Sequence, residues 1–337
     1  MSGPTSPTGA DNSRILRFSP FVHRHLGGPA RKVPLDAGFT CPNRDGSLSR
    51  SGCVFCPPAG AGTGLFASGV PLQEQWNIFS GRIREKYPNA KFIAYLQAYT
   101  NTHCSTRELR ALLNTIAALP GVAGLCLGTR PDCLDMDAPA GAAASRLEVL
   151  AEFAGTPGSP GKGGLGGHGF LQLDLGLQSA DDTVLARIGR GHDAACFAKA
   201  ARAAAQRGLH VCAHIMDGLP GAAEDDLCRS VDFLNALPIT GIKFHNTMVC
   251  QGTALEHLWR TGAYVPPDLE TYTERLMQAI ALLRPDICIQ RMAADPNPGE
   301  LVAPDWVADK STVFNHLEAA LIRLDVRQGQ NYRASAG

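Results

Sequence analysis

The stretch Leu35–Cys56, "LDAGFTCPNRDGSLSRSGCVFC", ends an apolar segment and opens a loop that carries three cysteines. Their spacing is Cys41-x11-Cys53-x2-Cys56, so the last two form a CxxC pair. Disulfides use cysteines in even numbers, and a structural zinc takes four ligands. Three thiolates can instead hold three irons of a [4Fe–4S] cube and leave its fourth iron open to a substrate or cofactor. The spacing therefore favours an iron–sulfur site.

Two other interpretations of the three cysteines remain open from spacing alone. A zinc ion could bind if His23, His25 or Cys104 supplied the fourth ligand. The three cysteines could also be unrelated residues of a loop. Neither alternative explains why the loop follows directly after an apolar strand.

Composition indicates an ordinary globular protein. Of the 337 residues, 45% are hydrophobic and 18% are charged, and 31 Lys and Arg balance 31 Asp and Glu. No apolar run is long enough to span a bilayer, and the N-terminus lacks the apolar core of a signal peptide. We therefore expect a cytoplasmic protein with no membrane contact, whose 11 cysteines stay reduced unless they bind metal.

Short apolar segments alternate with amphipathic ones along the chain. Such a pattern predicts parallel strands connected by helices. Polar or glycine-rich clusters follow the strands, which places them on the rim where barrel enzymes carry out their chemistry. The sequence thus predicts an α/β fold, a partial (βα)6 TIM-like barrel, with a doubly wound sheet as the alternative. The six predicted strands lie within residues 32–37, 91–98, 121–128, 170–179, 209–221 and 241–249.

The domain organisation follows from the same pattern. We expect a polar, disordered leader at 1–17 and a core barrel at 18–250, interrupted by a flexible glycine-rich loop at 155–169. A helical extension packed on the barrel is expected at 251–329, with a tail at 330–337.

A basic segment precedes the first strand. No acidic residue occurs between Asn12 and Leu35, whereas five are basic. The segment is interpreted either as a solvated basic edge or as a contact for RNA phosphates. The basic residues are Arg14, Arg17, Arg24, Arg31 and Lys32.

Several motifs recur in order at the predicted strand ends, and together they resemble the YhcC-type bacterial family of radical S-adenosylmethionine enzymes. The resemblance covers roughly residues 18–329. It implies a radical SAM core barrel with one [4Fe–4S] cluster on Cys41, Cys53 and Cys56 and with S-adenosylmethionine on the open iron. Reductive cleavage of the cofactor would yield a 5′-deoxyadenosyl radical that abstracts hydrogen from the substrate. The motifs are "KVPLDAGFTCPNRDG", "SGCVFC", "AYLQAYTNT", "TRPDCL", "LDLGLQS", "RGHD", "VCAHIMDGLPG" and "GIKFHNTMVCQGTALEHLWRTGAY".

The resemblance also implies cofactor contacts on the first two strand ends. Phe55, inside the CxxC, is similar to the aromatic residue that packs near the adenine, although ordinary loop packing is the alternative. Thr100 and Asn101 follow the second strand, where relatives hold the amino group of the cofactor. The Gly-Gly-Glu usual at that place in relatives is absent here.

Further candidates lie on the later strands. Asp174 and Gln178 follow the fourth strand and are candidates for binding the cofactor. Relatives often carry Glu where this chain has Asp174, whose side chain reaches one methylene less far, so the ribose contact does not carry over directly to Asp174. Arg190 is a candidate for the cofactor carboxylate, with a surface salt bridge as the alternative. Lys243 and His245 share one parity on the sixth strand and are expected to point into the barrel, as catalytic residues or as a structural ion pair.

The motifs "TRPD", "GLQS", "GLPG" and "GTALEHLWRTGAY" also resemble the radical SAM domain of the Elongator catalytic subunit. That resemblance implies modification of the wobble uridine of tRNA. Because the accompanying acetyltransferase domain is not matched, we expect trimming of a carboxymethylaminomethyl group to aminomethyl. A small metabolite or porphyrin-like substrate is the alternative, as is a non-enzymatic iron–sulfur redox protein. If the protein is a radical enzyme, the resemblance also implies a reducing partner such as flavodoxin or ferredoxin.

Overall fold

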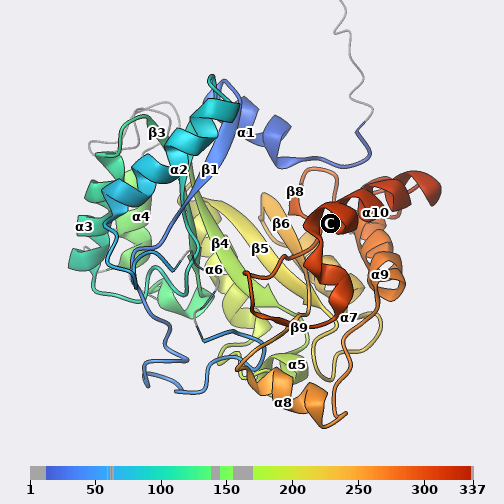
Figure 1. The fold of residues 1–337 in the computed structure, drawn as a ribbon. Helices are drawn as coiled ribbons and strands as arrows, with labels where there is room; N and C mark the ends of the chain where they lie inside the picture. Colours follow the sequence, from blue (N-terminus) through green and yellow to red (C-terminus); the bar gives the residue numbers. More distant parts are fainter. Residues whose placement is uncertain are drawn as a thin grey trace, which may run out of the picture.

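The computed structural model describes residues 13–58, 60, 62, 64–137, 145–154 and 170–334. Its centre is a curved sheet of seven parallel strands in the order β1-β2-β3-β4-β5-β6-β8 (Figure 1). The strands are β1 (Ala30–Leu35), β2 (Lys91–Leu96), β3 (Val122–Thr129), β4 (Phe170–Gln178), β5 (His210–Asp217), β6 (Gly241–Asn246) and β8 (Cys288–Arg291).

Helices cover the outer face of the sheet, and the apolar side chains between the two layers form the main core. On α3, for example, Leu109, Leu112, Leu113 and Ile116 are all buried at helical spacing. The helices are α1 (Phe18–Leu26), α2 (Leu72–Lys86), α3 (Thr106–Ala117), α4 (Arg146–Ala154), α5 (Asp182–Arg187), α6 (Ala194–Gln206), α7 (Asp226–Asn235), α8 (Ala254–Arg260), α9 (Leu269–Leu282) and α10 (Lys310–Arg323), with 3₁₀ turns at Pro131–Cys133 and Asp305–Ala308.

The predicted partial barrel is confirmed, and its sheet has one strand more than expected. Each of the six predicted strands is present, and neighbouring strands pair in parallel. The seventh, β8, pairs in parallel with β6 and comes from the segment predicted to be a helical extension. Four residues give too short an apolar run to be recognised against the surrounding helices. The division into a core of 18–250 and an extension of 251–329 stays a prediction.

Among the remaining C-terminal elements, α9 packs against α7 and α10, and α8 packs against β7 (Val249–Cys250). Strands β7 and β9 (Leu301–Ala303) form a small antiparallel pair. Figure 1 shows α8 at the same end of the sheet as α5 and the loop that follows β1, and shows α9 and α10 along the other side. Within the described ranges, no helix is long and apolar enough to cross a membrane.

Residues 13–17, assigned above to a disordered leader, are folded against β8. Ile15 is 3% exposed, and Arg17 forms a parallel bridge with Ile289. The amide of Ile289 donates to the Leu16 carbonyl at 2.8 Å. The buried side chain of Ile15 and backbone bonding to the free edge of β8 hold this segment in place. Residues 1–12, the glycine-rich loop at 155–169 and residues 335–337 of the tail lie outside the described residues.

Much of the basic segment is occupied by contacts within the protein. Arg14 pairs with Asp325 at 2.7 Å, and Arg17 pairs with Glu318 at 2.6 Å. Lys32 donates to Gln290, as detailed below. These side chains stabilise the fold, which limits what the segment can offer to an RNA backbone.

Candidate active site

The loop that carries the three cysteines lies at the C-terminal end of the sheet because it continues directly from β1. It folds back on itself, since the amides of Arg44 and Leu48 donate to the carbonyls of Cys41 and Pro42 at 2.7 and 2.8 Å. A further bond from Val54 N to Ile188 O, 3.0 Å, ties the loop to the end of α5.

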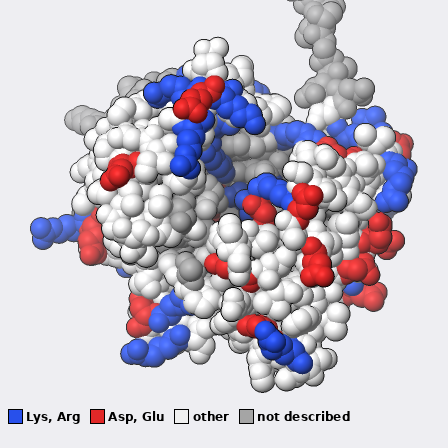
Figure 2. Space-filling view, viewed as in Figure 1, with Lys and Arg blue, Asp and Glu red and all other residues white. Residues whose placement is uncertain are grey.

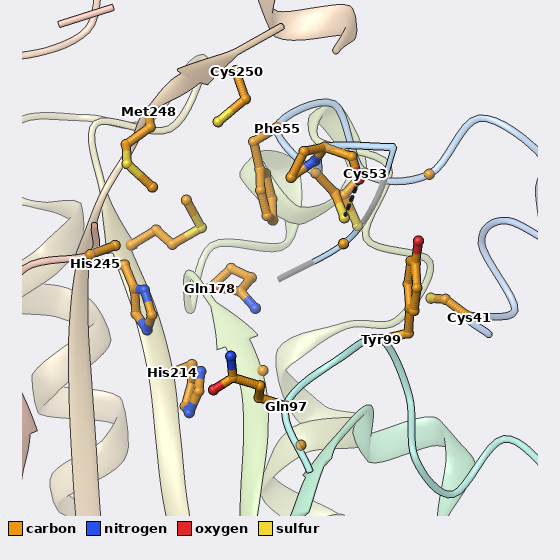
Figure 3. A pocket seen from close by; sticks show the side chains of 18 of the residues that line it. Cys41, Cys53, Phe55, Gln97, Tyr99, Gln178, His214, His245, Met248 and Cys250 are labelled. Atoms are coloured by element: carbon orange, nitrogen blue, oxygen red, sulfur yellow. Dashed lines mark hydrogen bonds between the residues drawn. The ribbon is translucent and has the colours of Figure 1, made fainter. Parts of the chain in front are cut away.

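All three cysteines line one cavity of about 350 Å³ inside the barrel mouth. This volume lies within the range of small-molecule sites, ~300–1,000 Å³. Figure 3 shows Cys41 and Cys53 on one side of this cavity, His214 and His245 on the other, and Gln178 between them. The cavity therefore has a sulfur side and an imidazole side.

Hydrogen-bond donors surround the sulfur side. The amide of Asn43 lies 3.5 Å from the Cys53 sulfur, and Arg190 Nη1 lies 3.9 Å from the same sulfur. Arg44 donates to the carbonyl of Cys56 at 2.7 Å. Burial raises the pKa of the Cys56 thiol, and the Arg44 guanidinium opposes that effect.

These donors fit an anionic iron–sulfur cluster. Hydrogen bonds to the sulfurs and nearby cations stabilise its charge. The zinc alternative loses its histidine ligands, because neither His23 nor His25 lines the cavity. The His25 ring lies 4.5 Å from the ring of His210, the first residue of β5, at the opposite end of the sheet from the cysteines. Cys104 is not among the residues that line the cavity.

Of the two residues predicted to bind the cofactor after the second strand, one lines the cavity and the other does not. Thr100 lines the cavity. Asn101 does not, because its amide donates to the backbone carbonyls of Ala98 and Gly128 at 3.0 and 2.9 Å. These bonds hold the ends of β2 and β3 together, and a cofactor contact from Asn101 stays a prediction.

Phe55, Gln178 and Arg190 all line the cavity. Gln178 has φ of 82°, a left-handed backbone that is uncommon outside glycine and that here follows a register shift in β4. Arg190 donates from Nη2 to Gly176 O at 2.7 Å, while its buried Nε has no partner among the described residues. The predicted surface salt bridge of Arg190 is not present there.

Lys243 is committed to the protein itself. Its ammonium lies 2.5 Å from Asp174 Oδ2 and 2.7 Å from the Tyr95 hydroxyl, and it is not among the cavity-lining residues. Burial alone would raise the pKa of Asp174, but Lys243, Lys32 and His214 outweigh it and hold that pKa well below its usual value. The structural ion pair that the sequence offered as the alternative is present, and a catalytic role for Lys243 stays a prediction. Asp174 lines the cavity but has its charge already matched.

This ion pair belongs to a chain of bonds that we call the polar floor. Lys32 Nζ donates to Gln290 Oε1 at 2.8 Å, and Gln290 donates to Gln172 at 2.8 Å. Gln172 donates to Asp174 Oδ1 at 2.6 Å. The chain connects β1, β8, β4, β6 and β2 across the barrel. The polar floor consists of Lys32, Gln290, Gln172, Asp174, Lys243 and Tyr95.

Two histidines stand between the polar floor and the open cavity. The rings of His214 and His245 are stacked with centroids 5.1 Å apart. Burial, and then Lys243, lowers the pKa of His214 to about 4. Burial, and then His214, holds the pKa of His245 well below 6.5. Both imidazoles are therefore neutral at pH 7.

Among the cavity-lining residues that sequence reasoning missed, four bear on the chemistry of the site. His214 sits on β5 with the inward parity used above for Lys243, so the same signal could have found it. Tyr99 follows β2 and has a positive φ of 54°. Cys250 was interpreted from the sequence as an ordinary buried core cysteine. Arg291 lies on the short strand that was not predicted.

Comparisons with known proteins agree with this geometry. The model described as the Radical SAM superfamily matches residues 164–234, and the Radical SAM C-terminal domain matches residues 239–323. Protein YhcC of Escherichia coli (strain K12) is 32% identical over 316 residues, which is 91% of this chain and 92% of that protein. A tRNA uridine(34) acetyltransferase of Dehalococcoides mccartyi is 31% identical over 175 residues, 51% of this chain and 33% of that protein.

A solved structure shares the fold. Archaeal Elp3 from Methanocaldococcus infernus, with an N-terminal deletion, superimposes with a TM-score of 0.62 at 16% identity, covering 89% of this chain and 64% of that one. At this identity the likeness concerns the fold alone. The extent of the match to YhcC, together with the superfamily match, shows that the chain belongs to the YhcC-type family of radical SAM enzymes.

Proposed function

We propose that this protein holds one [4Fe–4S] cluster on Cys41, Cys53 and Cys56 and modifies the wobble uridine of tRNA, trimming a carboxymethylaminomethyl group to aminomethyl. The observation that carries the proposal is the cavity itself, with three thiols on one side and polar groups on the other. The cluster and S-adenosylmethionine would supply a 5′-deoxyadenosyl radical for hydrogen abstraction.

The residues of the sulfur side suit a bound cofactor. Arg190 has an unpartnered Nε for a carboxylate, and Thr100 and Gln178 offer a hydroxyl and an amide to the same space. Phe55 gives an apolar face for a base. Asn43 and Arg44 position the cysteine loop, since Asn43 donates to Gly189 O at 2.8 Å and Arg44 donates to Cys56 O at 2.7 Å.

The choice of substrate rests on similarity. The Dehalococcoides relative is named for uridine 34 of tRNA. A base flipped out of an anticodon loop can reach into a cavity without a large protein footprint, which agrees with the balanced charge of the chain.

The reaction balances without a further oxidant. Modified uridine, S-adenosylmethionine and water would give aminomethyluridine, glyoxylate, 5′-deoxyadenosine and methionine. The substrate loses a hydrogen atom and an electron from the methylene between nitrogen and carboxylate, and water then cleaves the resulting carbon–nitrogen double bond. Those two electrons equal the two taken up in reductive cleavage of one S-adenosylmethionine. A reducing partner such as flavodoxin or ferredoxin would start the reaction, and we place it in the cytoplasm.

Mass spectrometry of tRNA nucleosides with and without the gene tests the substrate. Loss of the gene should raise carboxymethylaminomethyluridine at the wobble position and lower its aminomethyl product. An unchanged wobble-uridine profile would overturn the tRNA assignment.

A second measurement tests the cluster. Cys53→Ala should abolish iron binding and 5′-deoxyadenosine formation after anaerobic reconstitution. Cys196→Ala removes a half-buried cysteine of α6 outside the cavity and serves as the matched control. Full iron content in Cys53→Ala would contradict the assignment.

A further inference from the structure

Arg291 is a cation without a protein partner inside the cavity. It is the last residue of β8, lines the cavity and is half-buried. Across the part of the chain that the structure describes, its guanidinium has no hydrogen bond and no ion pair. A charge held partly out of water is costly unless an opposite charge joins it.

The groups that face Arg291 do not supply that opposite charge. His214 and His245 line the same side of the cavity, and Arg291 helps to keep both imidazoles neutral by lowering their pKa beyond the effect of burial. His245 Nε2 is buried and has no hydrogen-bond partner among the described atoms. A neutral imidazole can donate one further hydrogen bond to an anion.

The only carboxylate of the polar floor is already used. Asp174 accepts from Lys243 at 2.5 Å and from Gln172 at 2.6 Å. The polar floor thus contains two positive charges, Lys32 and Lys243, and one negative charge, Asp174. Arg291 adds a third positive charge next to it. Figure 2 shows Lys and Arg side chains, with some Asp and Glu among them, along the border of a hollow on this face of the molecule.

Two more carboxylates, Asp295 and Glu300, line the cavity. Asp295 pairs with Lys310 at 2.8 Å. Glu300 accepts from the amide of Asn297 at 3.0 Å, a neutral donor that leaves its negative charge unmatched. Lys32, Lys243 and Arg291 therefore carry three positive charges against the two negative charges of Asp174 and Glu300, which leaves one positive charge that a ligand can complete.

We propose that Arg291 binds a carboxylate of the substrate through its paired N–H groups, with His245 Nε2 as a second donor. This rests on the proposed function, in which the group to be removed carries a carboxylate one bond from the reacting methylene. A planar guanidinium matches a carboxylate with two parallel hydrogen bonds and so fixes the orientation of the methylene as well as its charge. Arg291 is then the residue that distinguishes the carboxymethylaminomethyl group from the aminomethyl product.

Binding of two nucleosides, carboxymethylaminomethyluridine and aminomethyluridine, to the cluster-loaded protein tests this. Neither nucleoside contains a phosphate, so a difference between them reports on the carboxylate. We expect the wild type to prefer the first by about 10- to 100-fold, the range for a hydrogen-bonded charge pair. Arg291→Gln should reduce the preference to within about threefold, and Arg291→Lys should keep part of it because lysine lacks the two-pronged geometry.

Controls separate this inference from other roles. Arg260→Gln removes an exposed arginine of α8 and should keep the full preference. The thermal midpoint of Arg291→Gln should match that of the wild type, since no ion pair is lost. Equal weakening of both nucleosides by Arg291→Gln would overturn the proposal. The proposal would also be overturned if Arg291→Gln no longer formed 5′-deoxyadenosine in the absence of any substrate, because that result would assign Arg291 to the cofactor.

Failure of the proposed function is distinguishable from failure of this inference. An unchanged tRNA profile combined with an Arg291-dependent nucleoside preference would remove the tRNA reaction and keep the carboxylate site. A wild type that binds both nucleosides equally would overturn the carboxylate site whatever the tRNA profile shows.

Discussion

Replacing Lys243 with methionine should destabilise the protein by about 3–5 kcal/mol, because it leaves the carboxylate of Asp174 buried without a counter-charge. The side chains of Lys243 and Asp174 are 5% and 0% exposed, and their charged atoms lie 2.5 Å apart. At an effective dielectric constant of about 20, unit charges at that distance attract by about 7 kcal/mol. The desolvation of both ions offsets part of this attraction, which gives the smaller net value.

The matched control is Arg110→Gln. Arg110 and Glu152 are also separated by 2.6 Å, but their side chains are 43% and 56% exposed. An ion pair in water contributes about 0–1 kcal/mol, so this variant should unfold close to the wild type. The comparison isolates burial, since the geometry of the two pairs is alike.

The double variant Lys243→Met/Asp174→Leu supplies the third measurement. Removing both charges should cost about 2 kcal/mol or less, because Gln172 can still donate to Gln290 at 3.2 Å. The Tyr95 hydroxyl loses its donor, and the His214 imidazole loses its contact with Asp174 at 3.4 Å. Equilibrium urea unfolding at pH 7, followed by circular dichroism, gives the free energies. The reasoning is refuted if Lys243→Met costs no more than Arg110→Gln, or if the double variant costs the sum of the single ones.

Two further predictions concern the ends of other strands. Burial raises the pKa of Asp217 to about 6 against the opposing effect of Arg275, so the folded chain keeps a proton between about pH 4 and pH 6 that the unfolded chain loses. The free energy of unfolding should therefore fall as pH rises through that window, by at most about 3 kcal/mol, and Asp217→Asn should remove this fall; parallel pH profiles of the two proteins would contradict it. Asn43 donates to Gly189 O at 2.8 Å and lies 3.5 Å from the Cys53 sulfur, so Asn43→Ala should lower the iron bound per chain after reconstitution, and wild-type iron content would speak against that role.

The sequence predicted the barrel because its strands are long and buried on both faces. β4, for example, is buried over eight of its nine positions, which gives a continuous apolar run. β8 has four residues, two of them polar, and α5 has six residues. Elements this short are stabilised by the structure around them. They contain too few residues for the periodicity of their apolar positions to be recognised in the sequence.

The candidate site was predictable where spacing or parity fixes it. The cysteine spacing and the inward parity of His245 follow from the chain alone. The partners of Lys243 and Asn101 do not, because the bonds to Asp174, Tyr95 and Gly128 reach strands that are distant in the sequence. Asn101 looked like a free polar group at a strand end, yet its amide closes the gap between β2 and β3. Arg291 was missed along with the strand that presents it.

The polar floor also constrains how the sequence can diverge. Most of its bonds join a donor on one strand to an acceptor on another, so a single substitution leaves a buried group unsatisfied on a different strand. An acceptable replacement must therefore change donor and acceptor together. Among homologous chains, these positions should be inherited as a set and replaced as a set, even though they lie far apart in the sequence.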